Sequence, residues 1–234
     1  MRLDKFLADT TDLTRSLATK AVKNGRVLVN GSKPKSASLK VSETDVVTLD
    51  GEALTHQGGF RYILMNKPTG YVCTHRDSTH PLVFDLLEGI VNRMDLHTVG
   101  RLDMDTTGLL LITDDGQWSH HLTSPKHHQP KTYRVWLAEP LREDAEAKLA
   151  KGILLEDDPE PTKPAELERV SDTEVLLTIH EGRYHQVKRM FAALGNHVEK
   201  LHREKMGCMD MDPTLQEGEY RPLTDEEVAA LAGN

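Results

Sequence analysis

The chain has 234 residues, of which 38% are hydrophobic, enough for a buried core in one large domain or in a small domain joined to a medium one. No apolar run reaches membrane-spanning length and the N-terminus lacks the apolar core of a signal peptide, so we expect a globular protein that stays in the cytoplasm. The formal net charge of −8 argues at first sight against a nucleic-acid partner, because neutralisation of phosphates dominates such binding.

The charge is unevenly distributed along the chain. Residues 1–50 carry nine Lys and Arg against six Asp and Glu, a net charge of +3, so the remaining residues carry −11. Within that acidic remainder, residues 180–205 hold six basic residues and four histidines against three glutamates. A basic face on an acidic body permits selective binding of RNA, although a solvated surface would explain scattered charge equally well.

The first 50 residues predict a small α-rich unit. Leu3, Phe6 and Leu7 have helical spacing, and a second helix is expected from the N-cap Thr14 to Gly25. The apolar residues of that second helix are Leu17, Ala18, Ala21 and Val22. A short strand at 27–29 then leads into an Asn-Gly turn. Residues 51–60 are polar, contain two adjacent glycines and predict a flexible joint.

Residues 61–234 alternate strands and helices, which predicts an α+β domain. Strands are expected at 62–65, 109–113, 132–137 and 174–180, and helices near 81–87, 117–122, 141–150 and 186–194. A last helix begins at Thr224, where Glu227 completes a capping box, and buries Val228 and Leu231. The acidic, proline-containing stretch 156–164 predicts an exposed, solvated loop.

The segment from Gly100 to Gly108 carries the strongest indication of chemistry. It reads Gly-Arg-Leu-Asp-Met-Asp-Thr-Thr-Gly and runs directly into the apolar strand 109–113. Asp103 therefore lies beside Arg101 on a turn between glycines that precedes a buried strand. Such a turn can hold a reactive carboxylate in a fixed place.

Four ordered motifs together resemble the RNA pseudouridine synthases. The first motif is 100–108, and the others are Leu-Met-Asn-Lys-Pro-Thr-Gly at 64–70, Lys-Thr-Tyr-Arg-Val at 131–135 and Glu-Gly-Arg-Tyr-His-Gln-Val-Lys-Arg-Met-Phe at 181–191. One such motif alone is weak, but four in order over this length are specific. The wording of the last motif, with Gly-Asn-His at 195–197, is similar to the RsuA type, which acts on small-subunit ribosomal RNA.

The resemblance implies a fold and a reaction. The fold is the pseudouridine synthase fold, a mixed, mostly antiparallel sheet flanked by helices with a central cleft. The enzyme is an isomerase, formally an intramolecular transferase, which flips a uridine out of 16S rRNA, breaks its N1–C1′ bond, turns the uracil and joins C5 to C1′. Uridine 516 is the family target. No cofactor is implied, and we expect a monomer that acts on 16S rRNA in an assembly intermediate of the small subunit.

The resemblance also implies which residues act. Asp103 is the essential carboxylate, acting first either as nucleophile or as base. Tyr133 forms an aromatic wall for the flipped base, and Arg101 fills the gap it leaves in the RNA. Tyr133 could instead be a core residue, and Arg101 could pair with a nearby aspartate. Lys188 stands where many relatives carry arginine and would keep Asp103 ionised, with Arg189 as the alternative partner.

The N-terminal unit, 1–50, resembles the S4 RNA-binding domain, whose two helices present basic side chains to structured RNA. The residues that would contact RNA there, together with Arg101, Arg183 and Arg189 of the catalytic domain, are Arg2, Lys5, Arg15, Lys20, Lys23 and Arg26. An ordinary helical subdomain with exposed basic residues is the competing interpretation. The resemblance thus divides the chain into an S4-like domain at 1–50, a joint at 51–60 and a catalytic domain at 61–234.

Other patterns carry less weight. The pairs His120-His121 and His127-His128 lack partners at metal-ligand spacing, so we expect no metal, and the distant Cys73 and Cys208 predict reduced thiols. The order Asp103-Met104-Asp105-Thr106 imitates the nucleophile loop of haloacid-dehalogenase-type phosphotransferases, with Asp114-Asp115 as the magnesium pair, but no apolar strand leads into it.

Two closer alternatives remain. One is a sister synthase that acts on 23S rRNA, and the other is a non-catalytic rRNA-binding factor of ribosome assembly. The second alternative predicts loss of the reactive residues, whereas Asp103, Tyr133 and a basic residue at 188 are present.

Overall fold

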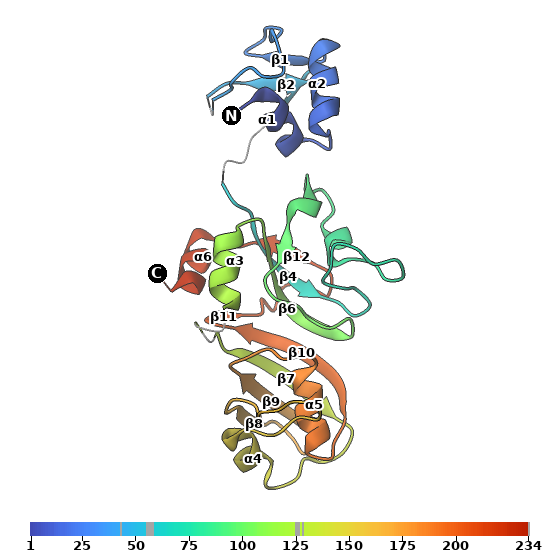
Figure 1. Cartoon of the computed structure of the whole chain (residues 1–234), viewed down its shortest axis with the longest axis vertical. Helices are drawn as coiled ribbons and strands as arrows, with labels where there is room; N and C mark the ends of the chain where they lie inside the picture. Colours follow the sequence, from blue (N-terminus) through green and yellow to red (C-terminus); the bar gives the residue numbers. More distant parts are fainter. Residues whose placement is uncertain (43, 55–58, 125–126, 128, 234) are drawn as a thin grey trace. The chain divides into compact units, whose positions relative to one another are not determined.

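The structure is a computed structural model that describes residues 1–42, 44–54, 59–124, 127 and 129–233. The chain forms two compact units, one of Met1–Phe60 with Leu87–Leu96 and one of Arg61–Leu86 with His97–Asn234. Each unit is described separately below (Figure 1). No helix within the described ranges is long and apolar enough to cross a membrane.

The first unit packs two helices on a three-stranded antiparallel sheet. The helices are α1 (Leu3–Thr10) and α2 (Arg15–Lys23), and the sheet has the order β1 (Val27–Val29), β2 (Val47–Leu49), β3 (Glu52–Leu54). Thr14 caps α2 by accepting a hydrogen bond from the amide of Leu17, as the sequence predicts. Leu17 itself is 45% exposed, so the buried face of α2 consists of Ala18, Ala21 and Val22.

The Asn-Gly turn after β1 is confirmed. Asn30 and Gly31 have φ of 50° and 77°, the left-handed pair that a tight two-residue hairpin loop requires. Strand β3 lies in the range predicted as a joint, because residues 52–54 continue the sheet by pairing with β2. Residues 55–58 of that range lie outside the described residues. The unit also contains the short 3₁₀ helix η2 (Arg93–Asp95).

The second unit is built on a nine-stranded sheet, which confirms the α+β prediction. Its main path runs β12 (Tyr220–Pro222), β4 (Tyr62–Lys67), β6 (Thr106–Thr113), β10 (Val198–Met206), β7 (Lys131–Leu137), β9 (Glu174–Ile179) and β8 (Glu166–Arg169). Two short strands pair at the side, β5 (His97–Thr98) with β6 and β11 (Met209–Asp210) with β10. The pairing of β6 with β10 is parallel, and every other neighbouring pair of strands in this sheet is antiparallel within the described residues.

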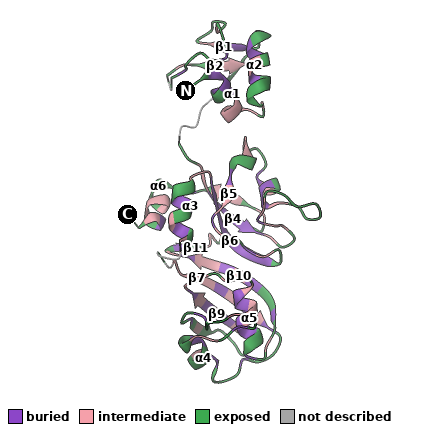
Figure 2. Ribbon diagram, in the orientation of Figure 1, coloured by how far each residue is buried: buried purple, intermediate pink, exposed green. Residues whose placement is uncertain are grey.

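Two helices pack beside each half of this sheet. Helices α3 (Gly116–Thr123) and α6 (Asp225–Ala232) lie beside β4 and β6, where Trp118, Leu122 and Leu231 share one buried cluster with Leu109. Helices α4 (Ala145–Lys151) and α5 (Gln186–Ala193) lie by β7 to β10 (Figures 1 and 2). The capping box of α6 is formed; Leu231 is buried and Val228 partly so.

Two predicted helices differ in the structure. The segment 81–87 contains only a 3₁₀ turn, η1 (Val83–Leu86), in which the amide of Asp85 donates to the carbonyl of Leu82 three residues earlier. The helix predicted at 141–150 begins only at Ala145, and the amide of Lys148 donates to the carbonyl of Asp144 in its first turn. The central strand β10 escaped prediction, since five of its nine residues are charged.

Gly108 sets the distance between the central strands. It has φ of 104°, and a Cβ atom there would lie 2.4 Å from the carbonyl oxygen of Arg203. Only glycine lets the backbones of β6 and β10 approach this closely at that point. The last glycine of the 100–108 motif is therefore required by packing.

Candidate active site

A cleft of about 730 Å³ crosses the middle of the second unit. Its walls come from the 100–106 loop, the central strands and the start of α5, which are far apart in sequence. Asp103, Tyr133 and Lys188 all line it, so the three residues to which the family resemblance gives catalytic roles meet in one place. Arg101 and Arg183 line it as well.

Asp103 lies between two basic side chains. The Nε2 atom of His185 is 3.4 Å from its Oδ1, and the Nζ atom of Lys188 is 3.5 Å from its Oδ2. The carboxylate is about one-third exposed and therefore open to the cleft. Each carboxylate oxygen thus faces its own basic group, one from the residue before α5 and one from α5 itself.

Lys188 makes its shortest contact with Asp105. Its Nζ atom donates to Oδ1 of Asp105 over 2.6 Å. Burial acts to raise the pKa of Asp105, but the hydrogen bond and charge of Lys188 outweigh it, so the pKa lies below its usual value. Lys188 therefore bridges two carboxylates of the same loop.

Arg189 points away from Asp103. Its Nη2 atom lies 3.1 Å from Oδ1 of Asp158, and its guanidinium also donates to the carbonyl groups of Tyr184 and Glu156. Of the two partners considered for Asp103, the structure brings Lys188 and not Arg189 to it.

The loop 156–164 is held by arginines. Arg183 donates to the Asp158 carboxylate over 3.1 Å and to the carbonyls of Glu160 and Pro161 over 2.8 Å each. With Arg189 on the same Asp158, the loop predicted to be merely solvated is tied to the segment that precedes and begins α5. Both arginines are thus engaged within the protein.

Lys67 holds the backbone of the reactive loop from the buried side of that loop. The sequence alone did not predict this role. Its side chain is fully buried at 0% exposure, and its Nζ atom donates to the carbonyl oxygens of Pro68, Asp103, Met104 and Thr106. Burial lowers the pKa of Lys67, while nearby acidic groups act against this. Three of its four bonds clamp the backbone of 103–106, so this lysine fixes the turn that carries Asp103. The Asn-Lys-Pro motif at 66–68 was the available signal.

His185 is the second residue that sequence reasoning did not single out. Its φ of 47° is left-handed, an uncommon conformation for a residue with a side chain, and it immediately precedes α5. Its ring stacks on Tyr184, with centroids 3.8 Å apart, and Tyr184 is 77% exposed. The cleft therefore has an aromatic pair at its rim beside Asp103.

Tyr133 is 8% exposed and lines the cleft. It is buried like a core residue and also faces the cavity, so its position on β7 is compatible with both interpretations. Arg101 is exposed, and the structure shows no ion pair between it and Asp103 or Asp105.

The phosphotransferase alternative fails on geometry. Asp114 pairs with Arg61 over 2.7 Å, and Asp115 caps α3 and accepts a hydrogen bond from the hydroxyl of Tyr62. Both carboxylates are therefore committed away from the cleft. Across the described ranges, no group of three or more His, Cys, Asp or Glu residues is arranged to hold a metal. The rings of His121 and His127 are tilted against each other with centroids 3.9 Å apart, His128 lies outside the described residues, and Cys73 and Cys208 are free thiols.

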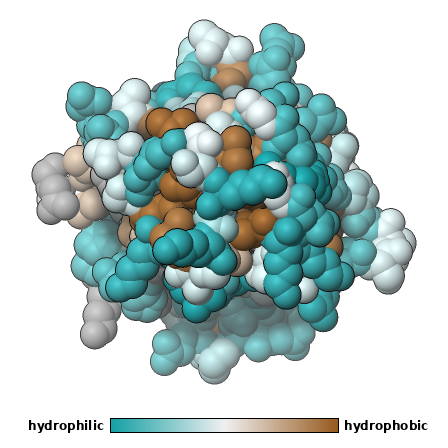
Figure 3. All heavy atoms as spheres, turned by 90° about the horizontal axis from the view of Figure 1, so that it is seen from above, coloured by the Kyte–Doolittle hydropathy of each residue, from teal (hydrophilic) through white to brown (hydrophobic). Residues whose placement is uncertain are grey.

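The six basic residues of the first unit that were predicted to contact RNA divide into two groups. Arg2 and Arg15 both pair with Asp4, and Lys5 and Arg26 pair with Asp9 and Asp50. Lys20 and Lys23, on the exposed side of α2, make no ion pair with the described residues. The face in Figure 3 is mostly hydrophilic, with some hydrophobic side chains near its centre.

Residues 61–193 match the RNA pseudouridylate synthase family and residues 1–47 match the S4 domain. The chain belongs to this family and is an RNA pseudouridine synthase, an isomerase, with an S4 domain at its N-terminus.

The most informative relatives are similar over their whole length. The chain is 56% identical over 231 residues to ribosomal small subunit pseudouridine synthase A of Vibrio cholerae, covering 99% of both chains. It is 51% identical over 231 residues to the Escherichia coli protein of the same name, covering 99% of this chain and 100% of that one. A solved structure described as a pseudouridylate synthase is 52% identical, with a TM-score of 0.71 and 99% of each chain covered.

Proposed function

We propose that this synthase converts one uridine of 16S rRNA, the family target uridine 516, to pseudouridine. The full-length similarity to synthases named for the ribosomal small subunit supports the choice of RNA. The observation that carries the chemistry is Asp103 in the central cleft, with Lys188 at one carboxylate oxygen and His185 at the other. The proposed substrate is an assembly intermediate of the small subunit, and the enzyme acts as a monomer in the cytoplasm.

The proposed reaction needs no redox step and no net hydrolysis. The target base flips out of the RNA stack, and its ring lies against Tyr133 while Arg101 occupies the vacated space. The N1–C1′ bond breaks, and Asp103 stabilises or captures the positive sugar carbon. The uracil then turns, C5 bonds to C1′, and the proton released from C5 is balanced by one gained at N1.

The cleft also bears on the non-catalytic alternative. A factor that only docks on rRNA has no need to keep a carboxylate, an aromatic wall and a lysine in one cavity. All three line this cleft, and the buried Lys67 holds the carboxylate loop in place at a cost in burial of charge. This arrangement favours catalysis.

The test maps pseudouridine by chemical labelling and primer extension on both ribosomal RNAs. RNA is taken from cells with the gene, cells without it, and deleted cells complemented with the wild type or Asp103→Asn. We expect one small-subunit site to disappear on deletion and to return only with the wild type. Asp103→Asn is nearly isosteric, so folding and RNA binding should persist while turnover is lost.

Other results would redirect the assignment. A missing site in 23S rRNA would keep the chemistry and replace the substrate by that of a sister synthase. No missing site, with RNA binding intact, would support the assembly factor. Retained turnover by purified Asp103→Asn would remove Asp103 from its catalytic role.

A further inference from the structure

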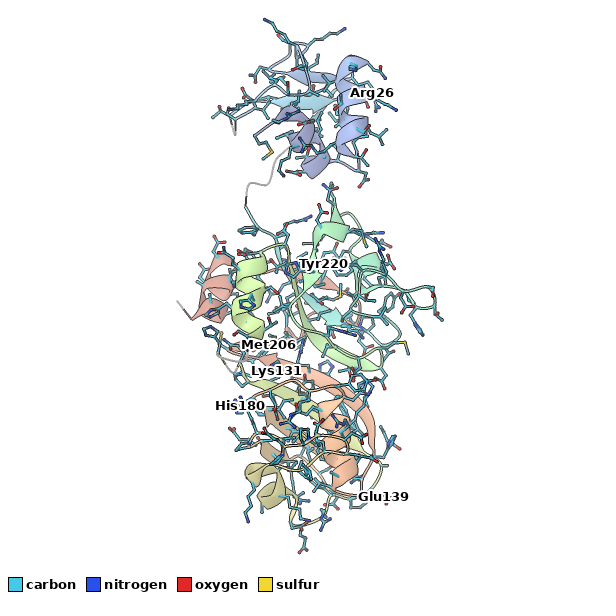
Figure 4. The ribbon with its side chains drawn as sticks, in the orientation of Figure 1. Arg26, Lys131, Glu139, His180, Met206 and Tyr220 are labelled. Carbon is cyan, nitrogen blue, oxygen red and sulfur yellow. The ribbon has the colours of Figure 1, made fainter. Side chains whose placement is uncertain are left out.

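The inner wall of the cleft carries two basic residues that the reaction described above leaves unused. In the sheet register, Arg203 of β10 lies directly opposite Tyr133 of β7. Lys131 lies two residues before Tyr133 on the same strand and therefore on the same face of the sheet. Both Arg203 and Lys131 line the cleft, and Figure 4 labels Lys131 together with the nearby Met206 and His180.

Arg203 is buried but incompletely satisfied. The residue is 1% exposed, and its Nε donates to the carbonyl oxygen of Leu109 over 2.8 Å. Its Nη2 atom is buried without a hydrogen-bond partner, and no ion pair is shown for it within the described part of the chain. A buried guanidinium with an open donor is costly unless something else accepts the bond.

Lys131 shows the same imbalance. Its Nζ atom donates to the carbonyl of Gln129 over 3.2 Å, and the described residues provide no carboxylate within ion-pairing distance. Burial, followed by the positive charge of Arg203, lowers the pKa of Lys131 to about 8. The hydroxyl of Thr106, which also lines the cleft, is likewise buried without a partner. The wall beside Tyr133 is thus rich in donors and poor in acceptors.

This inference rests on the proposed reaction, in which the flipped uracil supplies the hydrogen-bond acceptors that this wall lacks. A uracil stacked on Tyr133 presents two carbonyl oxygens, O2 and O4, at its edge. When N1–C1′ breaks, the bonding electron pair stays with the ring, and the resulting negative charge spreads onto these oxygens. Groups that bind this charge more strongly than the neutral base lower the barrier to cleavage.

We propose that Arg203 and Lys131 are catalytic residues that donate hydrogen bonds to the carbonyl oxygens of the flipped uracil and stabilise the uracil anion formed on cleavage. Asp103 then stabilises the positive sugar carbon at one end of the broken bond, and the two basic residues stabilise the negative base at the other end. Cytosine carries an amino group in place of O4, and its N–H donors would oppose these cations, so the same contacts favour uracil.

The experiment measures single-turnover pseudouridine formation and RNA dissociation constants with the full chain and a small-subunit RNA substrate. Lys131→Gln should slow the single-turnover step by about 100-fold, the usual effect of removing one such donor, with the dissociation constant nearly unchanged. Lys131→Arg should recover part of the rate. The matched control is Lys200→Gln, because Lys200 lies over Trp136 on the opposite face and should leave the rate unchanged.

Substrates with 2-thiouridine or 4-thiouridine at the target identify the oxygen involved, because sulfur accepts hydrogen bonds weakly. The thio substitution that slows the wild type should slow Lys131→Gln much less, since that contact is already gone. Arg203→Lys keeps a buried charge and tests the second donor. The midpoint of thermal unfolding of Arg203→Lys is also measured, so that a loss of rate is interpreted only if the variant is folded under the assay conditions.

Each remaining outcome overturns the inference. If Lys131→Gln and folded Arg203→Lys both keep wild-type single-turnover rates, the cations do not act on the base, while the proposed function stands. If Lys131→Gln weakens RNA binding and lowers its salt dependence at an unchanged rate, the lysine contacts a backbone phosphate instead. If the wild type itself forms no pseudouridine, the proposed function fails first.

Discussion

At the scale of single residues, the reactive loop is fixed by basic side chains at distinct points. Lys67 holds its backbone from within the core, while Lys188 bridges Asp103 and Asp105 at the surface of the cleft. His185 reaches the other oxygen of Asp103 from a left-handed backbone conformation. Positioning by several independent groups is what a carboxylate needs to meet one atom of a bound substrate.

Lys188→Met tests the bridge between the two carboxylates. The hydrogen bond and charge of Lys188 hold the pKa of Asp105 below its usual value against the effect of burial, so their loss raises that pKa. We expect single-turnover activity to fall by about 10- to 100-fold and the acidic limb of the pH–rate profile to move to higher pH. Arg189→Met, which breaks only the contact with Asp158 among the ion pairs, is the matched control. An unmoved profile in Lys188→Met would contradict the role given to this bridge.

At the scale of elements, the contact between β6 and β10 depends on one missing side chain. In Gly108→Ala the new Cβ would meet the Arg203 backbone at 2.4 to 3.0 Å, so the strands must separate and the left-handed φ is strained. We expect the free energy of unfolding to fall by about 3 kcal/mol or more, measured by urea denaturation. Gly116→Ala, at the start of α3 with nothing within 4 Å of its Cβ, should change it by less than about 1 kcal/mol. Equal stabilities of the two variants would refute the packing argument.

The cap of α3 gives a pH-dependent prediction. Asp115 accepts bonds from the amides of Gln117 and Trp118 and from the hydroxyl of Tyr62. Burial acts to raise its pKa, but these bonds outweigh it and lower the pKa. A carboxyl with a lowered folded-state pKa stabilises the fold above its unfolded pKa, and that stability disappears as pH falls through the folded value.

Asp115→Ala should therefore lower the free energy of unfolding by about 1 to 2 kcal/mol at neutral pH, and the difference from the wild type should shrink in acid. Thermal unfolding between neutral pH and about pH 3 measures it, with Asp115→Asn as the isosteric variant that keeps a capping oxygen. Activity measured below the melting transition should persist, because Asp115 lies outside the cleft. A stability difference that grows in acid would reverse the sign argued here.

At the scale of the whole molecule, RNA recognition is proposed to be shared by two units of opposite average charge. Lys20 and Lys23 are exposed on α2 and unpaired with described carboxylates, unlike Arg2, Arg15 and Arg26. Such unpaired lysines can form ion pairs with phosphates directly, whereas the paired arginines must first break an ion pair with an aspartate.

The double variant Lys20→Glu, Lys23→Glu should weaken RNA binding by at least about 10-fold at moderate salt and reduce the slope of log affinity against log salt by about two. The rate at saturating RNA should be unchanged, because both residues belong to the first unit and the cleft to the second. Lys148→Glu, Lys151→Glu makes the same charge change on α4 and is the control. Equal losses in both double variants would mean that only net charge matters.

The sequence by itself determined the elements whose signals are local. Thr14 and Thr224 cap their helices as predicted, Asn30-Gly31 forms the hairpin turn, and the apolar run before Thr113 is a buried strand, because caps, turns and burial periodicity are set by neighbouring residues. The ordered motifs likewise located Asp103, Tyr133 and Lys188, which the fold brings into one cleft.

Only the tertiary structure decided the partners of those residues. That Lys188 rather than Arg189 meets Asp103, that Lys67 clamps the carboxylate loop and that Arg203 lies beside Tyr133 all follow from strand register and from where α5 begins. The charged strand β10 is central because Leu201 and Arg203 on one face are buried, while Lys200 and Glu204 on the other face remain accessible to solvent. Contacts between segments far apart in the sequence depend on the relative placement of whole elements, and no local pattern records that placement.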